Sequence, residues 1–231
     1  MKEQLLLYLN EHKPARTLFE MMCKSGSVYL IGGVLREYRD HSAFVSLRDI
    51  DVVINVKDRE VFLAMIEQYS LHENRFGGHK LFCSDLLIDV WDIENTWAYR
   101  EKIIDCPHSE YVSRLADTVF LNIDGIIFDW ENNIWLDEKY VNAMQTKILD
   151  VVLPQNPLIM LNTLRTIILM DRYKMSLSAK LVEIIKDEYK KYESMQEFVE
   201  MLDVEQKKRY AHQIIEPYIL EEKTAKIINK G

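Results

Sequence analysis

The sequence predicts an α/β protein, in which a small mixed β-sheet with flanking helices is followed by a helical C-terminal domain. Two observations carry this prediction. Short apolar runs typical of strands, such as SVYLI, DVVINV and LLIDVW, alternate with helix-like segments up to about residue 150. From about residue 157 the apolar residues recur with helical spacing. We therefore expect an α/β domain at 1–150 and a helical domain at 151–231.

The expected elements follow from local patterns along the chain. Helices are expected at 2–11, 14–24, 34–40 and 58–70, and strands at 27–33, 47–56 and twice within 73–93, the first of these two broken by Gly77 and Gly78. Pro14 suits a helix start, and Asp58 begins an acidic capping pattern. A hairpin around Asn132 and Asn133, a further helix, and the strongest helix of the chain at 158–175 complete the prediction.

Composition and charge narrow the class of protein. Hydrophobic residues make up 48% and charged residues 29%, as in ordinary globular proteins. The formal net charge of -8 does not indicate a general nucleic-acid binder, although a local basic groove is compatible with it. The three cysteines have no disulfide or zinc-binding spacing, which favours reduced thiols in a cytoplasmic protein. We expect neither a signal peptide nor a membrane-spanning segment, and hence no membrane partner.

Two acids at alternate positions stand out in the strand expected at 47–56. Asp49 and Asp51 project from the same face of that strand, while Ile50 turns into the core. Two carboxylates this close repel each other unless a cation lies between them. Mg²⁺ suits such a pair because it takes oxygen ligands and keeps positions open for phosphate oxygens. An exposed strand with an acidic rim is the alternative, since a bare D-x-D is a common pattern.

The surrounding residues favour the metal interpretation. Gly32 and Gly33 lie where a strand gives way to a helix, so backbone N–H groups there could approach a phosphate. Arg36 lies one turn into that helix and could reach a phosphate or a carboxylate. A third acid is offered by LLIDVWDI, with Asp89 preferred and Asp92 as the competing choice. Together these residues predict a two-metal phosphoryl-transfer site.

The order of these motifs resembles the nucleotidyltransferase superfamily, with its polymerase-beta-like fold, and within it the head and neck of bacterial-type tRNA CCA-adding enzymes and poly(A) polymerases. VYLIGGVLRE resembles the family's G-G-x-x-R-D segment, with Glu37 in place of the aspartate, and RDIDVVI resembles its metal-binding strand. FGGHKLF, LIDVWDI and FLNIDGIIFD resemble the segments that follow, and PLIMLNTLRTIILMDRY resembles the first neck helix.

The resemblance implies roles for particular residues. Asp49 and Asp51 would bind two Mg²⁺ or Mn²⁺ ions, and Asp89 would complete the shell of the catalytic one. Gly32, Gly33 and Arg36 would hold the phosphates of a nucleoside triphosphate.

Other positions are open between a functional and a structural role. His79 and Lys80 could contact the triphosphate or be ordinary residues of a surface hairpin. Arg165 lies on an arginine position of the neck helix, where it would be near the nucleotide or in a structural ion pair. Arg48 and Arg75 are more typical of a solvated rim.

The chain also departs from the family pattern. Ala116, Asp117 and Thr118 stand where the family has R-R-D, and Gln155, Asn156 and Ile159 stand where it has the residues that template the incoming base. The chain ends before the regions that correspond to the body and tail of the full-length enzymes. We therefore do not expect CCA addition.

The predicted function is metal-dependent transfer of a nucleoside monophosphate from an NTP such as ATP to an acceptor hydroxyl, with release of pyrophosphate. An RNA 3′ end, such as that of tRNA, is the favoured acceptor. A protein or small-molecule acceptor and a catalytically inactive nucleotide- or RNA-binding module are the alternatives. No motif predicts the preferred base or the oligomeric state.

Overall fold

The computed structural model describes residues 1–231 except 45–46, 48, 75, 84–85, 211–213 and 230–231. Arg48 and Arg75 lie outside the described residues. The chain divides into two compact units, Met1–Thr118 with Asp124–Lys139, and Val119–Ile123 with Tyr140–Gly231. Leu121 pairs with Val151 in an isolated bridge, which accounts for the place of Val119–Ile123 in the second unit. The domain boundary expected at residue 150 stays a prediction.

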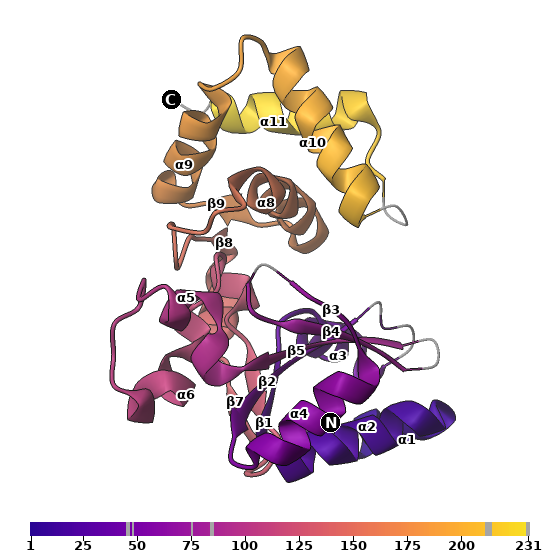
Figure 1. The fold of residues 1–231 in the computed structure, drawn as a ribbon. Coiled ribbons are helices and arrows are strands. Elements are labelled where there is room, and N and C mark those ends of the chain that lie inside the picture. Colours follow the sequence, from indigo (N-terminus) through magenta and orange to yellow (C-terminus); the bar gives the residue numbers. More distant parts are fainter. Residues whose placement is uncertain (45–46, 48, 75, 84–85, 211–213, 230–231) are drawn as a thin grey trace. The chain divides into compact units, whose positions relative to one another are not determined.

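The first unit is the α/β unit, and its predicted class is confirmed (Figure 1). Its helices are α1 (Lys2–Glu11), α2 (Lys13–Ser25), α3 (Gly33–His41), α4 (Arg59–Tyr69), α5 (Trp97–Arg100) and α6 (Tyr111–Arg114), with short 3-10 turns η1 (Ile93–Asn95), η2 (His108–Glu110) and η3 (Leu115–Asp117). Its strands are β1 (Gly26–Ile31), β2 (Ile50–Val56), β3 (Ser70–Glu73), β4 (His79–Cys83), β5 (Leu86–Asp92), β6 (Ile127–Asp129) and β7 (Ile134–Leu136). The turn η4 (Asn122–Asp124) and helix α7 (Glu138–Thr146) cross between the units.

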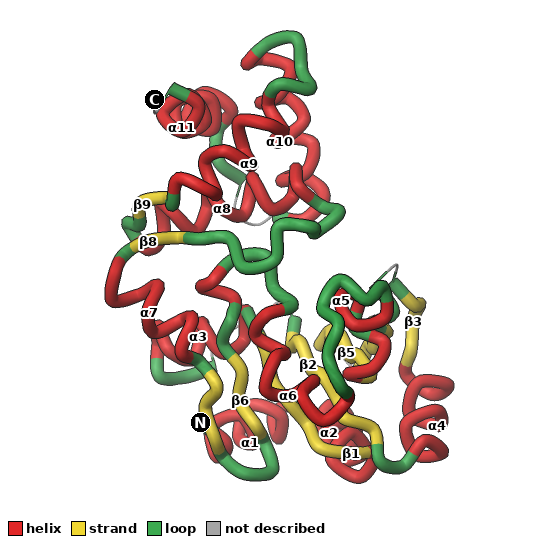
Figure 2. The backbone as a smooth tube through the Cα atoms, turned by 90° about the vertical axis from the view of Figure 1, so that its left-hand side faces the viewer, coloured by secondary structure: helices red, strands yellow, loops and turns green. Residues whose placement is uncertain are grey.

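The strands form one seven-stranded sheet in the order β3-β4-β5-β2-β1-β6-β7. β2 and β5 run parallel, and the other neighbouring pairs are antiparallel. Figure 2 shows β1 between β2 and β6, although β6 comes about a hundred residues later in the sequence. The sheet therefore brings together motifs that are far apart in the chain.

Alternation along β2 and β5 separates a buried face from a half-buried one. Ile50, Val52, Ile54, Ile88 and Val90 are each at most 1% exposed. α2 and α4 pack on this face of the sheet. On the opposite face, Asp51, Asp89 and Trp91 are half-buried, whereas Val53 is buried. The apolar core thus fixes the face from which the acids project.

Local signals explain how several elements begin and end. The Asp58 carboxylate accepts a hydrogen bond from Val61 N and caps α4, as predicted. Pro14 lies at the start of α2. Asn133 has φ of 57° in the predicted hairpin between β6 and β7, a conformation that asparagine tolerates better than most residues.

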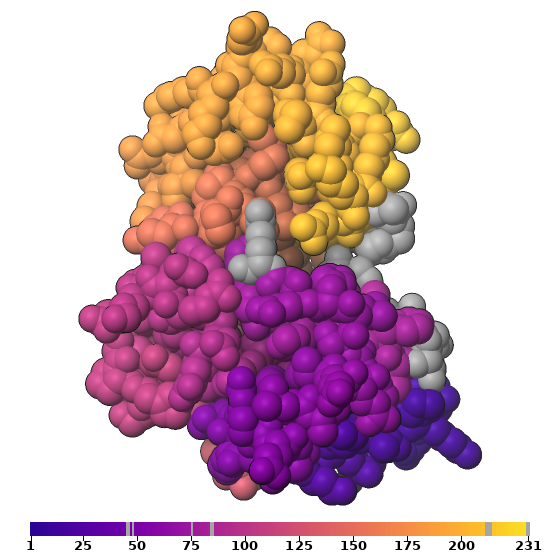
Figure 3. All heavy atoms as spheres, viewed as in Figure 1, coloured from indigo at the N-terminus to yellow at the C-terminus, as the bar shows by residue number. Residues whose placement is uncertain are grey.

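The second unit is helical, as predicted, except for one short parallel pair of strands. Its elements are β8 (Ile148–Leu149), α8 (Ile159–Tyr173), β9 (Ser176–Leu177), α9 (Ala179–Tyr189), α10 (Met195–Arg209) and α11 (Pro217–Ile228). α8 contacts each of the other three helices and buries Leu164, Ile167 and Leu169 among them. In the space-filling view, the atoms of α9–α11, coloured orange to yellow, leave little of the open space seen between these helices in the ribbon of Figure 1 (Figure 3).

A buried amide joins the last two helices of this unit. The Gln206 side chain is fully buried and donates to Ile215 O at 2.8 Å while accepting from Ile215 N at 3.0 Å. It therefore satisfies both backbone groups of one residue in the segment before α11.

No helix within the described residues is long and apolar enough to cross a bilayer.

Candidate active site

The register of the two parallel strands brings two of the predicted acids together. Asp51 on β2 and Asp89 on β5 are direct partners across the ladder. Side chains at partnered positions of neighbouring strands share a face. Asp49 immediately precedes β2, two residues before Asp51. That its carboxylate lies on the same face as that of Asp51 stays a prediction.

The glycine turn lies next to Asp51. Ile31, the last residue of β1, pairs with Asp51, and Gly32 follows it. Gly32 has φ of 65°, which an L side chain rarely adopts, and a Cβ there would lie 3.6 Å from Asp51 Oδ2. Its N–H donates to Ile126 O at 3.2 Å and ties the turn to the segment before β6. The predicted phosphate turn and the predicted metal ligand therefore stand side by side.

Arg36 lies beside the same turn but is engaged by an acid. Its guanidinium forms an ion pair with Asp124, and the side chains of both residues are 12% exposed. A Cβ on Gly33 would lie 3.8 Å from Arg36 Nη2, so the guanidinium folds back towards the start of α3. Contact of Gly33 or Arg36 with a phosphate stays a prediction. Asp124, which was not among the predicted site residues, fixes where the arginine points.

Lys80 pairs with the third acid. Lys80 and Asp89 are partners across the antiparallel β4–β5 ladder, and Lys80 Nζ lies 2.7 Å from Asp89 Oδ2. The other oxygen, Asp89 Oδ1, is buried and accepts no hydrogen bond from any described residue. His79, the residue before Lys80, projects to the opposite face, where the centroid of its ring lies 6.4 Å from that of Phe62 on α4. Of the two hairpin candidates, Lys80 is thus the one on the face of the acids.

The two glycines before β4 make room for neighbouring side chains. A Cβ on Gly78 would lie 2.2 Å from Trp91 Nε1, so the indole occupies the space that any larger residue would need. Gly77 has φ of 78°, and a Cβ there would meet Arg100 Nη1 and Asn95 O at 2.6 Å. Packing alone therefore explains why glycine stands at both positions. Trp91 itself lies on the face of the acids, two residues beyond Asp89.

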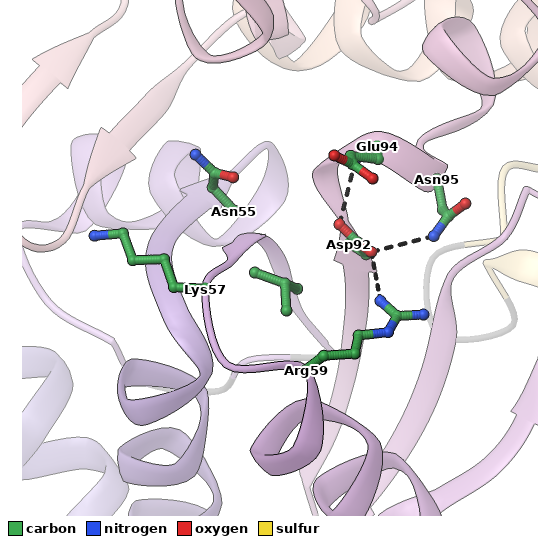
Figure 4. A pocket seen from close by; sticks show the side chains of 7 residues that line it. Asn55, Lys57, Arg59, Asp92, Glu94 and Asn95 are labelled. Carbon is green, nitrogen blue, oxygen red and sulfur yellow. Dashed lines mark hydrogen bonds and ion pairs between the residues drawn. The ribbon is translucent and has the colours of Figure 1, made fainter. Parts of the chain in front are cut away.

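Asp92, the competing choice for the third acid, has a different position and a full set of partners. It ends β5 and projects from the buried face, where its side chain is 8% exposed. Oδ2 accepts from Arg59 at 2.7 Å and from Asn95 at 3.2 Å, and Oδ1 accepts from Glu94 N (Figure 4). It lines a cavity of about 220 Å³ at the far ends of β2 and β5 from Asp51. Asp92 therefore caps η1, whereas Asp89 stands beside Asp51.

One buried carboxylate oxygen on the acid face has no hydrogen-bond partner among the residues that the structure describes, which fits the binding of a divalent cation there. A buried carboxylate oxygen without a partner is costly, and Asp89 Oδ1 is such an atom among the described residues. No group of three His, Cys, Asp or Glu side chains already stands together as a metal site in the described part of the chain. The metal stays a prediction, with Asp49, Asp51 and Asp89 as the residues that would hold it.

An ion-pair network occupies the place where the family pattern has R-R-D. Burial alone would raise the pKa of Asp117, but hydrogen bonds from Lys139 and Arg114 outweigh it and hold the pKa below 3.8. Lys139 Nζ lies 3.1 Å from one Asp117 oxygen, and Arg114 Nε lies 3.0 Å from the other. This aspartate is therefore a structural acid that joins η3 to the start of α7.

The remaining predicted residues lie in the helical unit. Arg165 is half-buried on α8, and a role in nucleotide binding stays a prediction. Asn122, which is not one of the predicted site residues, accepts from Asp150 N and donates to Ile148 O through its side chain, and so holds the strand β8. Asn156 accepts from Leu158 N and from the Asn162 side chain, both at 2.9 Å, and so fixes the start of α8.

Comparisons with known proteins show the fold. No protein-family profile and no curated protein matches the chain. Among solved structures, a CCA-adding enzyme with ATP matches with a TM-score of 0.62 at 13% identity, covering 92% of this chain. The chain has the fold of CCA-adding enzymes. A Thermotoga maritima CCA-adding enzyme complexed with tRNA matches with a TM-score of 0.58 at 14% identity over 87% of this chain.

A third solved structure agrees. A tRNA nucleotidyltransferase complexed with a primer tRNA and an incoming ATP analogue matches with a TM-score of 0.55 at 17% identity over 89% of this chain. The three matches cover 49%, 46% and 60% of the neighbours' own chains. This chain therefore spans about half the length of the CCA-adding enzymes that it matches, and the resemblance of fold that its motifs predicted is confirmed.

Proposed function

We propose that this chain is a nucleotidyltransferase that moves a nucleoside monophosphate from an NTP to an acceptor hydroxyl. The observation that carries the proposal is the pairing of Asp51 with Asp89 beside the Gly32 turn. Paired carboxylates that could hold a metal, and a glycine turn at a helix N-terminus, are parts that recur in phosphoryl-transfer sites. The shared fold with nucleotidyltransferases supports the same reaction class.

In the proposed reaction, the acceptor oxygen attacks the α-phosphorus and forms a new P–O bond. The bond from that phosphorus to the bridging oxygen breaks, and pyrophosphate leaves with the bonding electrons. Asp49, Asp51 and Asp89 would hold Mg²⁺ or Mn²⁺, which when bound activates the acceptor hydroxyl and offsets the charge of the phosphates. Asp89 is the candidate to take the proton of the acceptor hydroxyl.

The glycine turn and its arginine would hold the triphosphate. Gly32 has no side chain of its own, so its backbone could approach a phosphate, and the N-terminus of α3 favours negative charge. Arg36 lies beside this turn in its ion pair with Asp124. We propose that Arg36 acts on the phosphates from this position.

The proposed acceptor is an RNA 3′ end, because two structural neighbours were solved with tRNA. The net charge of -8 favours a protein or small-molecule acceptor instead. The same experiment distinguishes these acceptors. The protein is incubated with each α-labelled NTP, Mg²⁺ or Mn²⁺, and separate pools of cellular RNA and protein.

The variant and its control make the experiment specific. An Asp49→Ala/Asp51→Ala double variant should lose all incorporation, because it removes two of the three carboxylates. Glu94→Gln is the matched control, since the Glu94 carboxylate is 62% exposed and lies beyond the far end of β5. Label on RNA that is lost only in the double variant supports the proposal, and label on protein redirects the acceptor. Absence of incorporation with every NTP would reject the transferase.

A further inference from the structure

Lys80 occupies a place in the sheet that its sequence context did not reveal. Lys80, Asp89, Asp51 and Ile31 form one cross-strand row over β4, β5, β2 and β1. The side chains in such a row share one face of the sheet. Lys80 is therefore a basic residue next to the paired acids. Its ammonium is positively charged, as a bound metal ion would be.

The contact between Lys80 and Asp89 makes the two oxygens of the carboxylate different from each other. Oδ2 accepts from Lys80 Nζ at 2.7 Å, while the buried Oδ1 has no partner among the described residues. The Asp89 side chain is 13% exposed and that of Lys80 is 26% exposed. At this burial a carboxylate and its counter-charge are poorly screened by solvent, so the pair constrains both side chains.

We propose that Lys80 is a positioning residue for Asp89, one that holds Oδ2 and leaves Oδ1 as the only oxygen of this acid offered to a divalent cation. This inference rests on the proposed function. It gives Lys80 a different role from the triphosphate contact considered from the sequence, because the ammonium is committed to the acid. Lys80 also places a positive charge next to the cation site, so it weakens cation binding while it fixes the geometry of the ligand.

The proposal makes the stability of the protein depend on divalent cations in a specific way. Replacing Lys80 with methionine keeps an unbranched side chain, one atom shorter, and removes its charge. Asp89 Oδ2 would then lose its hydrogen bond from Lys80, and the buried Oδ1 would still have no partner among the described residues. The variant should melt at a lower temperature than the wild type without divalent cations, and added Mg²⁺ should raise its melting temperature more than it raises that of the wild type.

Two variants serve as controls for charge and for the partner. Lys80→Arg keeps a positive charge and a donor, so its response to Mg²⁺ should remain close to that of the wild type. Lys80→Met/Asp89→Asn removes both charges, so the loss of stability seen in Lys80→Met alone should be largely relieved, and the additional gain with Mg²⁺ should disappear. If Lys80→Met alone does not fold, restoration of folding by Asp89→Asn tests the same coupling.

Direct binding of Mn²⁺ to the full chain without nucleotide, followed by electron paramagnetic resonance, provides the second measurement. The proposal expects Mn²⁺ to bind Lys80→Met several-fold more tightly than the wild type. Equal Mn²⁺ affinity in the two proteins, or the same loss of stability on removing Lys80 whether or not Asp89 is present, would overturn it. Lack of nucleotidyl transfer by the wild type would reject the proposed function and leave these two results intact, so the two failures are distinguishable.

Discussion

The packing of Trp91 on Gly78 offers a test of the sheet geometry around the acids. In Gly78→Ala the new Cβ would lie 2.2 Å from Trp91 Nε1 and 2.4 Å from Cε2. Favourable contacts of this kind are about 3.5–4.0 Å, so the indole would have to move by more than about 1 Å. Trp91 is two residues from Asp89 on the same face of β5, so the displacement would begin next to the acid pair.

The expected cost can be set from this overlap. Overpacking of this kind destabilises a protein by about 1–3 kcal/mol. For a chain of this size, each kcal/mol lowers the melting temperature by about 2–4 °C. Gly33→Ala is the matched control, because the nearest atom to its Cβ is 3.8 Å away. Thermal unfolding followed by circular dichroism should show the difference between the two variants.

A second substitution identifies the cause of this loss. Trp91→Leu removes the indole, so Gly78→Ala should cost less in the Trp91→Leu background than in the wild type. The coupling between the two changes should exceed the roughly 0.3–0.5 kcal/mol within which independent sites add. Additive costs would refute the reasoning, since they would mean that the alanine meets something other than Trp91.

Two further outcomes are expected from the site. Gly32→Ala should cost about 1–2 kcal/mol in urea unfolding because its φ of 65° is left-handed, whereas Gly33→Ala should be neutral or slightly stabilising. The pKa of Asp117 is lowered below 3.8 by Lys139 and Arg114 against the opposing effect of burial, so its contribution to stability is present above that pH and is lost as the pH falls through the lowered pKa. Asp117→Asn should make unfolding stability less dependent on pH below about 4, and an unchanged pH profile would contradict the network.

Periodicity in the sequence predicts most elements of the α/β unit because each strand has one apolar face. Strand β3 was not predicted separately, since SLHE at its edge position is largely exposed and lacks an apolar pattern. The sequence also did not predict that β5 runs parallel to β2, because β1 and β5 flank β2 on opposite sides and no local pattern gives the direction of either pairing.

The partners of the site residues differ in how far a sequence could reveal them. Cys83 pairs with Leu86, and Lys80 and Asp89 stand opposite each other three residues further from this pair on each strand. No turn motif in the sequence fixes this register, but the alternation of apolar residues along both strands is consistent with it. Arg36 and Asp124 are 88 residues apart, and no local pattern connects them. Long-range ion pairs of this kind depend on the completed fold.

The departures from the CCA-adding pattern fall on elements other than the acid row. The row of Lys80, Asp89 and Asp51 depends on strand register, and that register is set by apolar residues on the other face of the sheet. The missing base-templating residues belong to the segment that begins α8, where the Asn156 side chain is used to hold Leu158 and Asn162. In the proposed function, phosphate chemistry and base choice would be carried by separate elements, so the first could persist while the second changes. Incorporation of the four NTPs therefore tests base choice by the segment that begins α8. Activity of the acid variants tests the role of the carboxylates on the sheet.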